Sequence, residues 1–176
     1  MSQPDATLLN APLTALTTLP GPAGGRADPL PVPGLAISCD PAAETDLRWS
    51  SPRGRLLELA ATPTRPGAWL MLRLTLDLPD LSGCAGLGFW LRGFADPALV
   101  MQAQIRSGTA EGHVDCVFDR DILCHAASSD HAGLMLADRT PDLPGRAPWR
   151  TFDLMLPPWR PVTLAIEALR VFTVPA

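Results

Sequence analysis

The sequence predicts an all-β fold, an antiparallel β-sandwich of the jelly-roll type, preceded by an extended N-terminal arm rich in proline and glycine. Three observations indicate this class. Apolar and polar residues alternate over many short segments, which is the period of a strand with one buried face. The 176 residues include 20 prolines, which are excluded from helix interiors and central strands. Turn-forming clusters separate the alternating segments at near-regular intervals, as in sandwiches.

The N-terminal residues 1–34 differ in composition from residues 35–176, which we interpret as the sandwich domain. The stretch LPGPAGGRADPLPVPG (19–34) predicts an arm or linker rather than a packed element, because proline and glycine interrupt regular structure. The preceding TLLNAPLTAL carries apolar residues that could dock on the domain or on a neighbouring chain. The first residues lack the basic and apolar regions of a secretory signal. We therefore expect cytoplasmic synthesis, with release or export only as part of an assembly.

From residue 35 onward the alternation predicts successive strands. AWLMLRLTLD (68–77) places four leucines on one face: Leu70, Leu72, Leu74 and Leu76. LGFWLRGF (87–94) and LVMQAQIR (99–106) alternate in the same way, and we interpret them as a hairpin with residue 94 opposite residue 100. Shorter segments follow at 55–61, 133–137 and 151–157. The segment 162–172 could form a helix of three turns, but its alternation favours a strand with an irregularity near Glu167–Ala168.

The segment GHVDCVFDRDILCHAASSDH (112–131) contains all three histidines and two cysteines. It forms either a hairpin around DRD (119–121) or one long bent strand. Both interpretations direct the same residues inward: Val114, Cys116, Phe118, Ile122 and Cys124. Free cysteine behaves as a small hydrophobic residue, so ordinary burial explains the cysteines. A disulfide between Cys116 and Cys124 is conceivable only in an oxidising compartment.

Metal and catalytic interpretations of this segment are less favourable. Its cysteines are eight residues apart and lie on the opposite face from His113 and His125, unlike the close ligand pairs of zinc sites. A calcium site at the DRD turn lacks any EF-hand pattern. A hydrolase using Asp115, His125 and Ser128 or Ser129 lacks the G-x-S-x-G motif. We expect no catalytic residues, no metal and no cofactor, and keep a small hydrolase or enzyme accessory domain only as a remote alternative.

The charge distribution excludes two classes of partner. The formal net charge is −4, and no run of basic residues is present, which argues against binding to nucleic acid or to anionic membranes. No stretch approaches the roughly 20 apolar residues of a membrane span. The expected partner is therefore a glycan or another protein.

The predicted hairpin gathers one indole with planar polar groups on its outward face: Trp90, Arg92, Gln102, Gln104 and Arg106. An indole can stack on the C–H face of a pyranose while amide and guanidinium groups bond its hydroxyls. Trp69 could extend this platform. The alternative is that the arm or a second layer covers Trp90. The remaining tryptophans, Trp49, Trp149 and Trp159, lie near predicted strand ends, where we expect them to close the sandwich.

Three segments show a similarity to a known family: GAWLMLRLTLDLPDLSGCAGLGFWLRGF, APWRTFDLMLPP and VTLAIEALRVFTV. The spacing of their predicted strands resembles that of the galactose-binding-like jelly rolls of carbohydrate-binding modules. The likeness covers residues 35–174 and includes no diagnostic motif. The resemblance implies a non-catalytic module that recognises glycan, displayed on a surface assembly such as a spike or fibre. The alternative is a structural or interaction subunit of a homo- or hetero-oligomer, whose arm (1–34) and exposed aromatic side chains contact partner chains.

Overall fold

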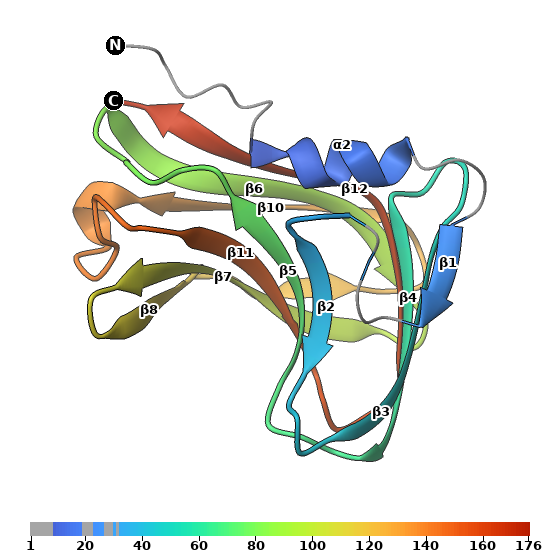
Figure 1. Ribbon diagram of the computed structural model, residues 1–176. Helices are drawn as coiled ribbons and strands as arrows, with labels where there is room; N and C mark the ends of the chain where they lie inside the picture. Colours follow the sequence, from blue (N-terminus) through green and yellow to red (C-terminus); the bar gives the residue numbers. More distant parts are fainter. Residues whose placement is uncertain (1–8, 19–22, 27–29, 31) are drawn as a thin grey trace.

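The computed structural model describes residues 9–18, 23–26, 30 and 32–176, and it is a sandwich of two antiparallel sheets (Figure 1). In strand order, sheet A contains β1 (Ala23–Arg26), β3 (Glu44–Ser51), β4 (Leu57–Arg65), β12 (Val162–Pro175), β6 (Cys84–Ala95) and β10 (Ser129–Leu136). Sheet B contains β2 (Leu35–Cys39), β5 (Leu70–Leu76), β11 (Arg150–Leu156), β7 (Leu99–Thr109) and β8 (Gly112–Val117), and β9 (Ile122–Cys124) also pairs with β7. The predicted antiparallel sandwich is confirmed.

The core lies between the two sheets and follows the predicted alternation. The four leucines of β5 are each at most 3% exposed. They lie beside the inward residues of β11, because Leu74 pairs with Phe152 and Leu72 pairs with Leu154. Phe152 also contacts Phe89 of sheet A, with ring centroids 5.4 Å apart. These contacts bury apolar surface between the two sheets, and this burial is the main favourable contribution to folding.

The last strand, β12, confirms the strand prediction for residues 162–172. It pairs with β4 at its start and then with β6 along most of its length. Its register shifts between Ile166 and Ala168, which is a β-bulge at the predicted irregularity. The bulge allows one long strand to keep its apolar residues inward on both sides of the shift. A helix in this segment is excluded.

Helix α2 (Ala11–Thr17) packs the N-terminal region onto the sandwich (Figure 1). Leu9, Leu13 and Leu16 are buried in the same apolar core as the strands. The interpretation of residues 19–34 as an unpacked linker is wrong where that range is described. Strand β1 pairs with β3, and both Leu30 and Val32 are buried. Residues 1–8, 19–22, 27–29 and 31 lie outside the described part.

The predicted hairpin between residues 87–94 and 99–106 is wrong. Strand β6 lies in sheet A, between β12 and β10, whereas β7 lies in sheet B. Both edges of β6 are therefore occupied by strands distant in sequence. The chain from Asp96 to Ala98 crosses from one sheet to the other. Alternation reveals which face of a strand is buried but not which strand is its neighbour.

Within the histidine- and cysteine-containing segment, β8 and β9 both pair with β7, whereas residues 129–131 begin β10, which pairs with β6. The turn lies at Ala110–Glu111, so the hairpin around 119–121 is wrong and the bent-strand alternative holds. Cys116 pairs with Ile105 and Cys124 with Leu99. Those partners are six residues apart on β7, about 20 Å along the strand, which is too far for a disulfide. Both cysteines are free and buried, so the inward assignment is confirmed.

The helices described here are short, and none has the length and apolar character needed to cross a membrane. The 3-10 helix Ala137–Arg139 follows β10 directly. Among the described residues no cluster of three or more His, Cys, Asp or Glu side chains could hold a metal ion.

Candidate functional site

The outward surface of sheet B combines fixed polar side chains with two tryptophans, and we call it the polar face. Its members come from four strands and the segments beside them: Trp69, Arg73, Gln102, Gln104, Arg106, Asp115, Trp149 and Asp153. The strand registers place them side by side, since Arg73 pairs with Asp153 and Asp153 pairs with Gln104. These positions alternate with the buried leucines, so the same periodicity that builds the core directs them outward.

The centre of the polar face is an ion pair between β5 and β11. Arg73 donates from Nε and Nη2 to the two carboxylate oxygens of Asp153, each at 2.8 Å. Gln104 donates from Nε2 to Oδ2 of the same carboxylate at 3.4 Å. Asp153 is 0% exposed, so its charge is removed from water and requires this compensation. The two-point contact fixes the orientation of the guanidinium plane.

A second two-point pair lies beside the first, between β7 and β8. Arg106 donates from Nε and Nη2 to the Asp115 carboxylate at 2.6 and 2.7 Å. This hydrogen bonding lowers the pKa of the Asp115 carboxyl below its ordinary value and raises the pKa of Arg106. His113 Nε2 lies 3.9 Å from Asp115 Oδ2. The two pairs contribute equal numbers of positive and negative charges to this part of the face.

Trp149 lies at one end of the polar face, directly on the backbone of β7. A methyl group added at Gly108 would lie 2.5 Å from Trp149 Nε1, so only glycine permits this close approach. The indole is 42% exposed. It forms one wall of a cavity of about 520 Å³ that is also lined by Thr75, Asp77 and Pro12. An aromatic ring, a hydroxyl and a carboxylate thus border one hollow beside the ion pairs.

Trp69 lies at the other end of the face, immediately before β5. From Trp69 to Asp77 is eight residues, about 26 Å along an extended strand. The polar face therefore has an indole near each end and hydrogen-bonding groups between them. Such an arrangement can contact the apolar faces and the hydroxyl groups of an elongated polar molecule.

Four of the six residues predicted as a binding platform lie together on the polar face: Trp69, Gln102, Gln104 and Arg106. The other two do not, because β6 belongs to sheet A. Trp90 lies on the outer face of sheet A with the Arg170 guanidinium 5.8 Å from its ring centroid. Arg92 donates from Nε to Glu167 at 3.0 Å. The single platform of the predicted hairpin is thus divided between opposite surfaces of the sandwich.

The sequence interpretation missed Asp153 and expected Trp149 to close one end of the sandwich. Asp153 interrupts an apolar segment at an outward position, a signal that was available but could not identify Arg73 as its partner. Of the three tryptophans expected to close the sandwich, only Trp49 is buried, at 7% exposure. Trp159 is 68% exposed in the turn before β12.

The hydrolase alternative is not supported by the described geometry. Asp115 is engaged by Arg106, and the His125 Nδ1 atom accepts a hydrogen bond from the Ala127 amide at 3.2 Å. Ser128 donates to Glu167 at 2.7 Å, so it has a carboxylate partner rather than a histidine. Ser129 Oγ lies 2.9 Å from Nε2 of His131 and is not paired with His125, so the triad of Asp115, His125 and a serine is not assembled.

Comparisons with known proteins identify the fold. A scan against protein-family models found no match, and a search among curated proteins also found none. Solved structures do match. The family 11 carbohydrate-binding module of Clostridium thermocellum, in complex with a β-1,3-1,4-mixed-linked tetrasaccharide, is 11% identical with a TM-score of 0.51, covering 90% of this chain and 98% of its own.

Two further structures show the same similarity. The CBM22-1 xylan-binding domain of Paenibacillus barcinonensis is 8% identical with a TM-score of 0.54, covering 88% of this chain and 94% of its own. A family 4 carbohydrate-binding module is 14% identical with a TM-score of 0.51, covering 80% and 94%. At these identities the likeness establishes the fold. The resemblance to jelly-roll carbohydrate-binding modules is confirmed at that level.

Proposed function

We propose that this chain is a non-catalytic module that binds a glycan on the polar face. The observation that carries the proposal is the pair of two-point ion pairs, fixed on an outward sheet surface between the exposed indole of Trp149 and the half-buried indole of Trp69. A pyranose offers an apolar C–H face to an indole and a ring of hydroxyls to polar groups. The polar face provides partners for both.

The ion pairs leave donors available to a ligand. A guanidinium has five N–H groups, and the contacts of Arg73 and Arg106 with carboxylates use the Nε and Nη2 nitrogens of each. The Nη1 groups can donate to sugar hydroxyls from side chains that are already oriented. Preorganised groups lose less conformational entropy on binding, which improves affinity. Because the paired charges cancel, we propose an uncharged glycan.

The same contacts support a binding role without catalysis. The carboxylates of Asp115 and Asp153 are both held by guanidinium groups. The pKa of Asp115 is lowered, which is opposite to the raised pKa that a general acid needs near neutral pH.

The ligands of the structural neighbours suggest which polysaccharides to test first. One neighbour was solved with a mixed-linked β-glucan tetrasaccharide, and another is described as xylan-binding. We therefore propose native affinity electrophoresis of the full chain through gels containing mixed-linked β-glucan or xylan. We expect one of these polysaccharides to retard the protein. Trp149→Ala should weaken the retardation at least about tenfold, within the range for losing a buried aromatic contact.

Two matched variants make this test specific. Trp159→Ala removes an equally large, exposed indole outside the polar face and should leave retardation within about twofold of the parent. Gly108→Ala keeps the indole of Trp149 but displaces it from β7, so it should weaken binding as Trp149→Ala does. Equal effects of Trp149→Ala and Trp159→Ala, or no retardation by any polysaccharide in a broad panel, would refute the proposal.

A further inference from the structure

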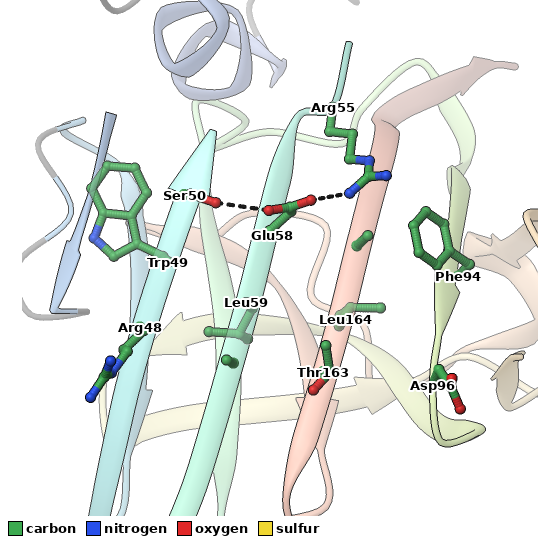
Figure 2. Close-up of a pocket in the computed structure, with 12 residues that line it drawn as sticks. Arg48, Trp49, Ser50, Arg55, Glu58, Leu59, Phe94, Asp96, Thr163 and Leu164 are labelled. Atoms are coloured by element: carbon green, nitrogen blue, oxygen red, sulfur yellow. Dashed lines mark hydrogen bonds and ion pairs between the residues drawn. The ribbon is translucent and has the colours of Figure 1, made fainter. Parts of the chain in front are cut away.

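The outer face of sheet A, on the opposite side of the sandwich, contains a separate cavity of about 320 Å³ (Figure 2). Its floor consists of short side chains on two neighbouring central strands. Ala60 of β4 pairs with Thr163 of β12, and Ala165 lies two residues further along the same strand. These positions face outward, because Leu59 and Leu164 between them point into the core. Short side chains bordered by long ones leave a hollow in the sheet surface.

The walls of the cavity are larger side chains held by contacts with one another. The Arg55 guanidinium lies 5.0 Å from the centroid of the Phe94 ring, a cation–π contact. Glu58 accepts hydrogen bonds from Arg55 and from Ser50 Oγ, the latter at 3.0 Å (Figure 2). Phe94 of β6 and Asp96, which directly follows that strand, lie on the other side (Figure 2). The cavity thus has an apolar floor, an aromatic edge and a polar rim.

Most of the charged groups around the cavity are paired with one another. Its lining includes the guanidinium groups of Arg48 and Arg55 and the carboxylates of Glu58 and Asp96. Arg48 is paired with Asp46 at 3.0 Å, and Arg55 is paired with Glu58. Within the described part of the chain, the Asp96 carboxylate makes no hydrogen bond or ion pair and can accept two hydroxyl donors. With Asp46 counted, two guanidinium groups stand beside three carboxylates, so an anionic ligand would be repelled, whereas a neutral polyol would find donors and acceptors together.

We propose that this cavity is a second glycan-binding site, which takes one neutral pyranose unit at the end of an oligosaccharide. The C–H face of the ring would lie on Ala60 and Ala165 beside Phe94. Its hydroxyls would donate to Asp96 and accept from Arg48. Pockets of this kind, with an apolar lining and a few placed polar groups, are typical of small-ligand sites. The proposal shares the carbohydrate ligand class with the proposed function but is independent of the polar face.

The test is a two-dimensional amide NMR titration of the full chain with neutral tetrasaccharides, one mixed-linked β-glucan and one xylan fragment. We expect one set of shift changes around Thr75, Gln104 and Trp149 and a second, separately saturating set around Ala60, Thr163 and Ala165. Thr163→Leu fills the cavity from its exposed floor and should weaken the second binding event at least tenfold without affecting the first. Thr62→Leu changes an exposed threonine of β4 outside the cavity and should affect neither.

The outcomes separate the two proposals. Shift changes confined to the cavity support this site and refute the function proposed for the polar face. Shift changes confined to the polar face, or equal cavity binding by the parent and Thr163→Leu, overturn the second site. Tighter cavity binding by an oligosaccharide ending in a uronic acid overturns its preference for neutral sugars. If no sugar changes the amide shifts around either the polar face or the cavity, both proposals fail.

Discussion

Arg150 is fully buried, and its side chain points inward among apolar residues. Its guanidinium donates to the Leu78 carbonyl at 2.9 Å, to Ser107 Oγ at 2.7 Å and to the Pro144 carbonyl at 2.5 Å. Burial lowers the pKa of this guanidinium, which still remains protonated at neutral pH. Arg150 therefore holds the loops that contain Leu78 and Pro144 against the start of β11.

Replacing Arg150 by Met is expected to lower the free energy of unfolding by about 3 kcal/mol, because two buried acceptors and one part-buried acceptor lose a charged donor. Urea denaturation followed by tryptophan fluorescence measures this change. Arg146→Met is the matched control, since Arg146 pairs with Asp80 on the surface and such pairs contribute about 0–1 kcal/mol. A smaller loss for Arg150→Met than for Arg146→Met would contradict this account of Arg150.

At the scale of elements, the region of α2 contacts the part of β12 that extends beyond its pairing with β4. The side chain of Asn10 acts here as a substitute for a strand neighbour. Asn10 Nδ2 donates to the Val171 carbonyl at 3.0 Å, and the Val171 amide donates to Asn10 Oδ1 at 2.9 Å. Leu13 and Leu16 bury the apolar side of the helix in the core. These leucines contribute to the fold of their own chain, so they are not available to the interaction-subunit alternative.

Asn10→Ala is expected to cost about 2 kcal/mol in unfolding free energy, because two hydrogen bonds to the Val171 backbone are lost. Amide hydrogen exchange at Val171 should accelerate before exchange in the centre of sheet A does. Thr14→Ala, at an exposed position of the same helix, provides the control and should leave Val171 protected. Unchanged exchange at Val171 in Asn10→Ala would show that α2 is held by its leucines alone.

At the scale of the whole molecule, carboxylates stabilised by local contacts are distributed around the sandwich. The pKa of Asp40 and of Asp80 is lowered first by backbone amide donors, that of Asp115 by Arg106, and that of Glu167 by Ser128. A carboxyl whose pKa is lower in the folded state stabilises the protein above its ordinary pKa. That contribution is lost as the pH falls through the folded pKa.

We therefore expect the free energy of unfolding to decrease from about pH 5 downward, since the ordinary pKa of these carboxyls is near 4. Urea midpoints measured between pH 7 and pH 3 test this dependence. Asp115→Asn removes one contributing group and should make the decrease shallower. A midpoint independent of pH in this range would contradict the expected linkage.

The candidate site shows where sequence reasoning reaches its limit. Gln102, Gln104 and Arg106 were correctly placed on one outward face, because all three belong to a single alternating strand. Trp90 was wrongly added to them, because the neighbour of β7 is β11 rather than β6. Asp153 was missed because its partner Arg73 is 80 residues away. The errors at Trp90 and Asp153 concern which strands are adjacent, and neither concerns which face of a strand is buried.

The sequence by itself determined the all-β class, the buried face of most strands, the bulge in β12 and the inward cysteines. These properties depend on the two-residue period and on local turn chemistry, which a single segment contains in full. Only the tertiary structure decided the strand order, the packing of α2, the polar face and the cavity on sheet A. Those features depend on pairing between distant segments, and many pairings satisfy the same alternation until the whole core is packed.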